Sequence, residues 1–462
     1  MVCCWRLPLL RVTTSEVTTW DDLLPDQAKR LPDELARIDA YLDEERFIAP
    51  WRAVFSARLG RRSVPVPTLL RLLYLRHRYQ LGYQSLCKEV GDSIAWRRFC
   101  RIPLDQPVPH PTTLSKLVGR AGPQVIDQLN HALLAKLAAG KLLRARKLRV
   151  DTTVVKADID DPTDADLLEQ AVRISAGWCA ASRPTASPPP PLPGPLPAGR
   201  RLKQLSHTLR RRTGVAIGEV DRLTAQVATI ARRAVGEVAA VQHAAHRTLA
   251  RRPGDGWARR LTGQLDQTVT LTGRLLDQTA QRLAGNRSIP DRVVSLADPD
   301  ARPIRKGKPR SPTQFGSTLL LAEDERGFIA DHLLAKGNPP DAPQLLPAVR
   351  RVAELRGRPP GAVVADRGFG FAANDRALAE LGVRRIGLQR TGRPSTARRE
   401  LERTRAFKRL PTWRVGIKAT ISHLKRSFGM RRTRLRHLAG AQTWAGLGIL
   451  AYNLQRMTIV AG

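Results

Sequence analysis

The chain has few cysteines and lacks any long apolar run. Its five cysteines form no C-x-x-C pair and have no histidines at zinc spacing, so neither a zinc site nor a disulfide framework is supported. They are Cys3, Cys4, Cys87, Cys100 and Cys179. No apolar stretch is long enough to cross a bilayer, and the N-terminus lacks the long apolar segment of a signal peptide. We therefore expect a cytoplasmic protein of a reducing compartment that makes no contact with membrane.

Acidic residues are also scarce. Asp and Glu total 41 against 78 Lys and Arg, which gives the 462 residues a net charge of +37. Such a charge repels itself unless a polyanion neutralises it, and nucleic acid is the usual polyanion. A hydrophobic content of 42% excludes a disordered basic tail, because it can fill the cores of two or three domains. A basic RNA-associated protein and a membrane-surface protein are the alternatives at this point.

Residues 21–122 are predicted to form a helical N-terminal DNA-binding domain. A dense apolar helix around Leu69–Leu75 precedes two short helices, Tyr83–Val90 and Ser93–Phe99, with a tight turn between them. This arrangement is typical of a helix-turn-helix-like unit. A further helix is expected to begin at Pro111 with a Thr or Ser cap. A plain helical bundle with a solvated basic face fits the same pattern equally well.

Two segments are predicted to interrupt the second half of the fold. The proline-rich residues 182–199 predict an extended linker, because they can neither form helix nor pair as a strand. Residues 200–290 predict two antiparallel helices with a break at Pro253–Gly256. The charged faces of these helices are more often solvated than bound to DNA. The region is therefore interpreted as a helical insertion between the segments 145–180 and 300–462.

Two short apolar segments each carry an acid. Asp151 lies within Leu148–Lys156, and Asp366 directly follows Ala362–Ala365. A buried acid is costly unless it is paired, and two of them in a basic chain suggest carboxylates that hold metal for phosphodiester chemistry. The alternatives are that Asp151 pairs with a nearby Arg and that Asp366 caps the turn before Gly368.

The order of the remaining elements is that of a ribonuclease-H-like domain. After Arg302 the pattern predicts a strand, a hairpin turn at Glu323–Gly327, a second strand, a helix, a strand, a capped helix, a strand and C-terminal helices. The expected bounds are Phe315–Leu321, Phe328–Leu334, Ala342–Arg356, Ala362–Ala365, a helix capped by Asn374 and Asp375, Arg384–Leu388, and helices from Ser395 to Met457 broken near Pro411 and Gly440. We thus expect an α+β or α/β fold: a helical N-terminal domain, then a ribonuclease-H-like mixed-sheet domain with a helical insertion after its first strand.

Several motifs resemble one known family. The stretches Arg149–Val155, Ala365–Phe369, Arg414–Arg426 and Gly440–Trp444 resemble the DDE-type transposases of bacterial insertion sequences. One subgroup of that family carries a Tyr-Arg-Glu-Lys signature on its last catalytic helix, with two, three and six residues between its members. Here Arg414 and Lys425 stand in the Arg and Lys places, Pro411 in the Tyr place and Lys418 in the Glu place.

The resemblance implies a site, a cofactor and partners. Asp151 and Asp366 would be the catalytic residues and the first two metal ligands, and two Mg²⁺ ions (or Mn²⁺ as a substitute) would serve DNA cleavage and strand transfer. Double-stranded DNA at transposon ends and at targets would be the partner, bound by a homodimer or larger assembly in a prokaryotic nucleoid. The expected DNA-binding residues are Arg414, Lys418, Lys425, Arg426, Arg431 and Arg432.

Lys418 leaves three interpretations open, because an ammonium cannot ligate a cation. The protein is a catalytically impaired transposase, or Glu400 or Glu402 replaces the missing acid, or Lys418 keeps a DNA-binding role. Impairment ranks first. A non-catalytic DNA-binding protein derived from a transposase, which occupies element ends as a repressor, is the functional alternative.

Overall fold

The computed structural model describes residues 7–12, 23–58, 60–160, 162–181, 214–251, 254–286, 288–305 and 313–461. The chain divides into two compact units. The smaller is built mainly from Ile159–Phe315, and the larger combines Cys4–Asp158 with Gly316–Gly462. The predicted linker 182–199 lies outside the described residues. No described helix has both the length and the apolar character needed to span a bilayer.

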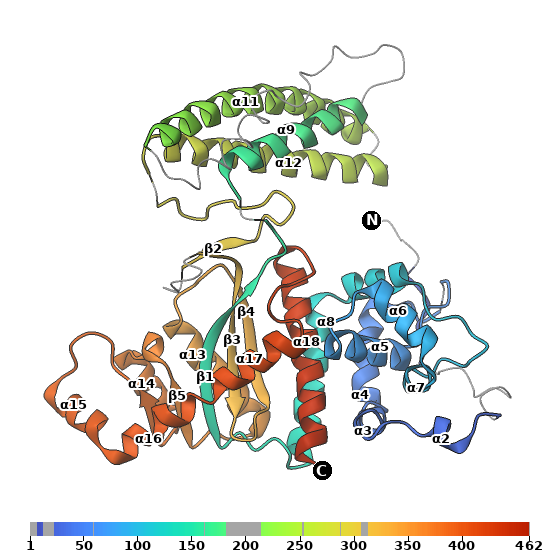
Figure 1. Ribbon diagram of the computed structural model, residues 1–462, viewed down its shortest axis with the longest axis vertical. Helices are drawn as coiled ribbons and strands as arrows, with labels where there is room; N and C mark the ends of the chain where they lie inside the picture. Colours follow the sequence, from blue (N-terminus) through green and yellow to red (C-terminus); the bar gives the residue numbers. More distant parts are fainter. Residues whose placement is uncertain are drawn as a thin grey trace. The chain divides into compact units, whose positions relative to one another are not determined.

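The smaller unit is helical. It contains α9 (Asp164–Ala181), α11 (Gly214–Arg251) and α12 (Gly256–Leu283), which pack against one another along their lengths (Figure 1). Leucines and valines of all three helices form its core, with Leu168, Val227 and Leu275 fully buried. The two predicted helices and the break between them are confirmed, and α9 adds a third helix that the sequence pattern did not suggest. The short strand β2 (Arg302–Ile304) follows.

The larger unit begins with a series of helices. They are α2 (Asp26–Lys29), α3 (Asp33–Tyr41), α4 (Glu45–Ile48), the 3₁₀ helix η1 (Ala49–Val54), α5 (Val66–Arg78), α6 (Tyr83–Asp92), α7 (Ile94–Phe99) and α8 (Pro111–Ala139). The predicted short helix pair is confirmed as α6 and α7. The predicted Thr or Ser cap of α8 is wrong: His110 is the cap, and its ring accepts from the backbone N–H of Thr112 at 3.3 Å.

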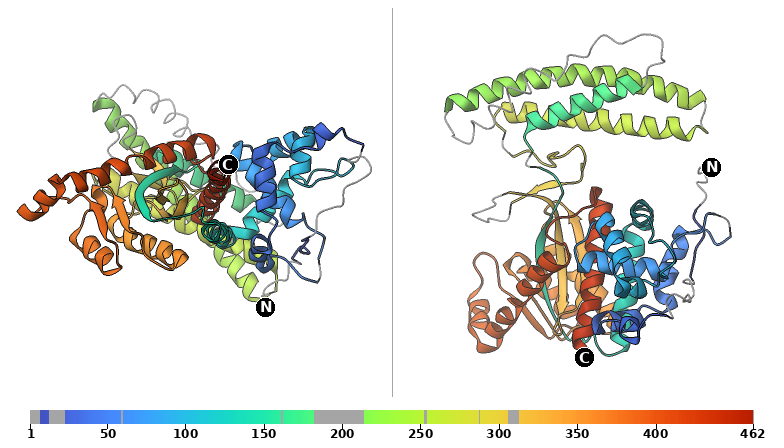
Figure 2. Two further views of the ribbon diagram at one scale, coloured as in Figure 1. Left: turned by 90° about the horizontal axis from the view of Figure 1, so that it is seen from below. Right: turned by 45° about the vertical axis from the view of Figure 1, so that its right-hand side comes forward.

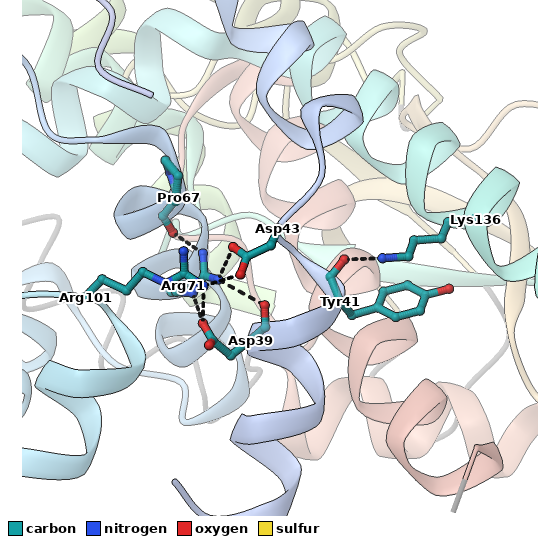
Figure 3. A network of polar contacts seen from close by, with 7 residues as sticks. All are labelled: Asp39, Tyr41, Asp43, Pro67, Arg71, Arg101 and Lys136. Carbon is teal, nitrogen blue, oxygen red and sulfur yellow. Dashed lines mark hydrogen bonds and ion pairs between the residues drawn. The ribbon is translucent and has the colours of Figure 1, made fainter. Parts of the chain in front are cut away.

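A buried arginine ties the first helices together (Figure 3). Arg71 of α5 is fully buried, and its guanidinium donates to Asp39 Oδ1 at 2.5 Å and to Asp43 Oδ1 at 2.8 Å. Arg101 donates to the same two carboxylates. Burial alone would raise the pKa of Asp43, but the hydrogen bonds from Arg101 and Arg71 outweigh it and lower the pKa. A buried charge needs such partners, so this network fixes α3 against α5.

The sheet of the larger unit has the mixed order of the predicted fold. Its strands are β1 (Lys147–Lys156), β3 (Gln314–Asp324), β4 (Ile329–Lys336), β5 (Ala362–Ala365) and β6 (Arg385–Leu388). They run in the order β4-β3-β1-β5-β6; β3 is antiparallel to its neighbours β4 and β1, and β5 is parallel to its neighbours β1 and β6. A helical region followed by this sheet is consistent with a ribonuclease-H-like transposase fold, as predicted. The hairpin is shorter than predicted, because Glu323 and Asp324 belong to β3.

Helices cover both faces of the sheet. They are α13 (Ala342–Arg356), α14 (Ala372–Glu380), α15 (Thr396–Arg403), α16 (Arg405–Arg414), α17 (Ile417–Ser427) and α18 (His437–Val460). The long α18 packs against β4 and also against α8 and α5, so it joins the N-terminal helices to the sheet (Figures 1 and 2). The amide of Asn453 both accepts from the N–H of Ile329 and donates to its carbonyl, each at 3.0 Å. One apolar core therefore runs through the larger unit.

Three predicted helix boundaries in the C-terminal half are wrong. Asn374 and Asp375 lie inside α14, which begins after Phe371. Pro411 lies within α16, and Gly440 lies in the first turn of α18. Helix α16 ends at Arg414 and α17 starts at Ile417, and a tighter turn with hydrogen bonds three residues apart joins the two helices. Arg414 and Lys418 belong to α16 and α17, and the backbone of Val415 and Gly416 between them keeps right-handed helical dihedral angles.

Candidate active site

Two neighbouring strands bring the predicted acids together. Strands β1 and β5 are parallel, and Val150 is opposite Ala365 in their register. Asp151 and Asp366 each come next along the chain, so they lie at adjacent positions. The carboxyl end of β5 thus lies beside the middle of β1, and Asp151 and Asp366 lie next to each other at this edge of β5.

Asp151 is surrounded by charge. Its side chain is 11% exposed, and its two oxygens accept from Thr152 N at 2.9 Å and from Arg414 Nη1 at 3.1 Å. Burial, and next the charge of Asp366, raise the pKa of Asp151 above its ordinary value, while Arg414, the Thr152 N–H and Lys418 lower it without cancelling the rise. The arrangement therefore gathers two carboxylates and two cationic side chains around one point.

Asp366 caps the turn that follows β5. Its carboxylate accepts from the N–H of Gly368 at 2.9 Å and begins the 3₁₀ helix η3 (Arg367–Phe369). A Cβ on Gly368 would lie 3.1 Å from Asp366 Oδ1 and 3.2 Å from Asp341 Oδ2. Asp341 also accepts from the hydroxyl of Thr152 at 3.3 Å. The turn therefore keeps a further carboxylate close to Asp366, from the residue directly before α13.

A buried ion pair fixes the chain that carries Lys418. Arg149 donates from Nη2 and Nε to Glu323 at 2.7 and 2.9 Å, and Glu323 is fully buried. Thr420 of α17 donates to the same carboxylate at 2.8 Å. A Cβ on Gly416 would lie 2.1 Å from Arg149 Nη1, so any larger residue there would require the guanidinium to move. These contacts hold the start of α17 against β1, and Lys418 is exposed in the first turn of that helix.

Sequence reasoning missed the pair of Arg149 and Glu323. The run of charges from Glu323 to Arg326 favoured a turn, although β3 continues through Asp324. One signal was present: Arg149 and Asp151 alternate along a strand and so share one face of the sheet. An arginine on a buried face needs an acid opposite, and Glu323 is its register partner on β3.

The six predicted DNA-binding residues differ in their exposure and in their ion pairs. Arg414 is committed to Asp151, with its side chain 15% exposed. Arg432 is exposed and pairs with Asp158 at 3.0 Å. Lys425 is partly buried in the last turn of α17. Exposed side chains of Lys418, Arg426 and Arg431 complete the set.

Of the two predicted replacement acids, one is already used. Glu402 of α15 accepts from the N–H of Arg390 and from Arg398 Nε, each at 2.9 Å. Burial raises the pKa of Glu402, but these hydrogen bonds outweigh it and lower the pKa. Glu400 is exposed on the same helix. The carboxylate of Glu402 thus serves to hold α15 beside the end of β6.

Two family models match the chain. One, described as a transposase domain (DUF772), matches residues 20–120, and the other, described as a transposase DDE domain, matches residues 270–454. No curated protein and no solved structure gave a match. Asp366, Arg414 and Lys418 lie within the second match, whereas Asp151 lies between the two. Together the matches support an insertion-sequence transposase of the DDE type.

The side chains present do not fit a pair of metal ions. DDE transposases generally use divalent metal ions, which carboxylate oxygens hold. Within the described part of the chain, no group of three or more His, Cys, Asp or Glu residues is arranged to hold a metal. Asp151 already has Arg414 as its charge partner, and Lys418 can only donate. The predicted ligands Asp151 and Asp366, with Asp341 near Asp366, are thus not arranged as a metal cage, and Asp151 is engaged by a cationic side chain of the protein itself.

Proposed function

We propose that the chain is an insertion-sequence transposase that binds the DNA of its element's ends and is impaired in DNA cleavage and strand transfer. The observation that carries the impairment is the charge around Asp151. Arg414 and Lys418 both favour its ionised form, so the protein supplies from its own side chains the positive charge that metal ions would otherwise supply.

The proposal assigns Lys418 to the position of a lost glutamate. In the Tyr-Arg-Glu-Lys subgroup a third acid would stand there, on a helix that passes over the first strand. Lys418 follows Gly416 at the start of α17, close enough to Asp151 to lower its pKa. A glutamate at this position would face the same carboxylates, and Glu and Lys codons can differ by one base. A single change from Glu to Lys at position 418 would thus have impaired a site whose other residues are still in place.

DNA is the partner that the charge of the chain favours. The net charge is +37, Lys418 is exposed near Asp151, and Arg426 and Arg431 are exposed at the end of α17 and just after it. Phosphate neutralisation by such residues releases counterions, so binding should weaken steeply with salt. Synapsis of two element ends requires a dimer or a larger assembly on DNA, which is part of the proposal.

Binding tests the DNA half of the proposal. Fluorescence anisotropy of the full chain with a labelled duplex, taken from the DNA that directly flanks the gene, should show a dissociation constant that rises linearly with salt on a log–log plot. Each phosphate contact should add about 0.9 to the slope. A duplex of scrambled sequence should bind more weakly at the same salt. A flat salt dependence would contradict DNA binding by this basic surface.

A further inference from the structure

A second basic site lies in the N-terminal helices of the larger unit. A pocket of about 480 Å³ opens between the segment that contains Pro8 and Arg11, the chain before α5, the chain before α8, and the first turns of both helices. Its size is within the range of sites that hold small ligands or ligand groups. The predicted recognition unit α6–α7 does not line it.

The lining has one sign of charge. Six basic side chains and no acid line the pocket: Arg11, Arg61, Arg62, Arg101, Lys116 and Arg120. Arg101 is occupied by Asp39 and Asp43, as Figure 3 shows. In the part of the chain that the structure describes, the other five make no ion pair with a carboxylate. Lys116 and Arg120 stand one turn apart on α8, where like charges repel, so the empty arrangement is unfavourable.

Two helix N-termini add to this charge. Thr68 lies in the first turn of α5 and Thr113 in the first turn of α8, and both line the pocket. The positive ends of helix dipoles favour anions. Thr68 is 2% exposed, and within the described chain its hydroxyl has no hydrogen-bond partner. Because this hydroxyl is closed off from solvent, what the two helix starts offer an anion in the pocket is the positive end of their dipoles.

We propose that this pocket binds a backbone phosphate of double-stranded DNA. The inference rests on the proposed function for its ligand, and it places a DNA contact at the starts of α5 and α8 in addition to the surface near Lys418. A phosphodiester carries the negative charge and the acceptor oxygens that cationic side chains use, and five of the lining cations make no ion pair among the described residues. Because phosphate contacts carry no sequence information, the pocket would position DNA and leave sequence recognition to other residues.

Charge removal at the pocket is the first test. Lys116→Ala with Arg120→Ala should weaken binding of the full chain to both the flanking-DNA duplex and the scrambled duplex, by on the order of tenfold at moderate salt. The log–log salt slope should fall by roughly one to two, about one for each phosphate that the variant no longer neutralises. A matched control is Arg232→Ala with Arg233→Ala, two exposed arginines of α11. Lys88→Ala, an exposed cation of α6, is the control for the predicted recognition unit.

Failure of the pocket inference can be distinguished from failure of the proposed function. If the wild type binds DNA and the Lys116/Arg120 variant binds with unchanged affinity and slope, the pocket inference is wrong and the proposed function stands. If the wild type does not bind DNA at all, both fail. If inorganic pyrophosphate raises the melting temperature of the wild type while the variant binds DNA normally, the pocket takes a small phosphate compound, and the DNA assignment is wrong.

Discussion

Arg414 donates to Asp151 across 3.1 Å, although 263 positions separate the two residues in the chain. The contact joins the end of α16 to the middle of β1. It gives the first candidate metal ligand a charge partner from within the protein. Lys418 also lowers the pKa of Asp151, but burial and Asp366 outweigh both cations, so the pKa stays above its ordinary value.

The first prediction concerns stability and pH. The folded-state pKa of Asp151 is raised above its ordinary value near 3.8, so its ionised form costs folding free energy at every pH above the raised value. Asp151→Asn should therefore raise the melting temperature at neutral pH. The gain should shrink as the pH falls through the raised pKa toward 3.8, where the wild-type carboxyl takes up its proton.

Thermal melts of both proteins at neutral and acidic pH measure this gain. Arg414→Gln is the companion variant: because Arg414 lowers the pKa of Asp151, its loss should destabilise the protein at neutral pH. An Asp151→Asn protein that melts below the wild type at neutral pH would show that the ionised carboxylate stabilises the fold instead.

The second prediction concerns metal affinity. Lys418→Glu replaces an ammonium by a carboxylate beside Asp151 and should strengthen Mn²⁺ binding roughly tenfold or more, since affinity follows the number of charged ligands. Lys418→Gln removes the positive charge without adding an anionic ligand, so its Mn²⁺ affinity should lie between those of the wild type and Lys418→Glu. Isothermal titration calorimetry measures all three. Equal affinity of the wild type and Lys418→Glu would place Lys418 outside the metal site.

The third prediction concerns the pair of Glu323 and Arg149. Glu323 is fully buried and the Arg149 side chain is 14% exposed, so removing one partner leaves a charge with little solvent. Glu323→Ala should cost about 3–5 kcal/mol in the free energy of unfolding, measured with denaturant. The double variant Glu323→Leu with Arg149→Met should lose less than the sum of its single changes. A Glu323→Ala loss below about 1 kcal/mol would contradict a structural role for the pair.

The fourth prediction compares two glycines. Gly416→Ala would drive a methyl group into the Arg149 guanidinium and should destabilise the protein by about 1–3 kcal/mol. Gly236 lies inside α11, and a Cβ there would meet nothing within 4 Å. Gly236→Ala should therefore stabilise by about 0.5–1 kcal/mol through helix propensity. Denaturant unfolding measures the free energy of unfolding of both variants. Equal changes in the two would mean that the Arg149 side chain moves away from the added methyl group without loss of stability.

Local sequence patterns were sufficient for the strands that carry the acids. An apolar run with an acid inside it located β1, and the short run Ala362–Ala365 located β5, because buried strands leave such runs. Helix Ala342–Arg356 was also predicted with its bounds, since prolines and an acid mark its start. These features depend on neighbours in the chain, which is why a single sequence reveals them.

Contacts between distant segments could not be predicted in this way. Gly416 approaches the Arg149 guanidinium, which lies far away in the sequence, whereas local propensity favoured a helix break near Pro411, a residue that lies inside α16. Glu323 looked like a turn residue until β1 placed Arg149 opposite it. The basic pocket likewise needs segments near residues 11, 61, 110 and 116 to meet, and no local pattern marks such a meeting.

DNA nicking by the wild type and by Lys418→Glu tests the central claim most directly. A supercoiled plasmid that carries the DNA flanking the gene would be incubated with each protein in Mg²⁺ and in Mn²⁺, and with Lys418→Glu combined with Asp151→Asn as the control. We predict that only Lys418→Glu cuts and that the added Asp151→Asn change abolishes cutting. Equal cutting by the wild type would contradict the account, because the third acidic ligand would then lie elsewhere and Lys418 would not impair the site.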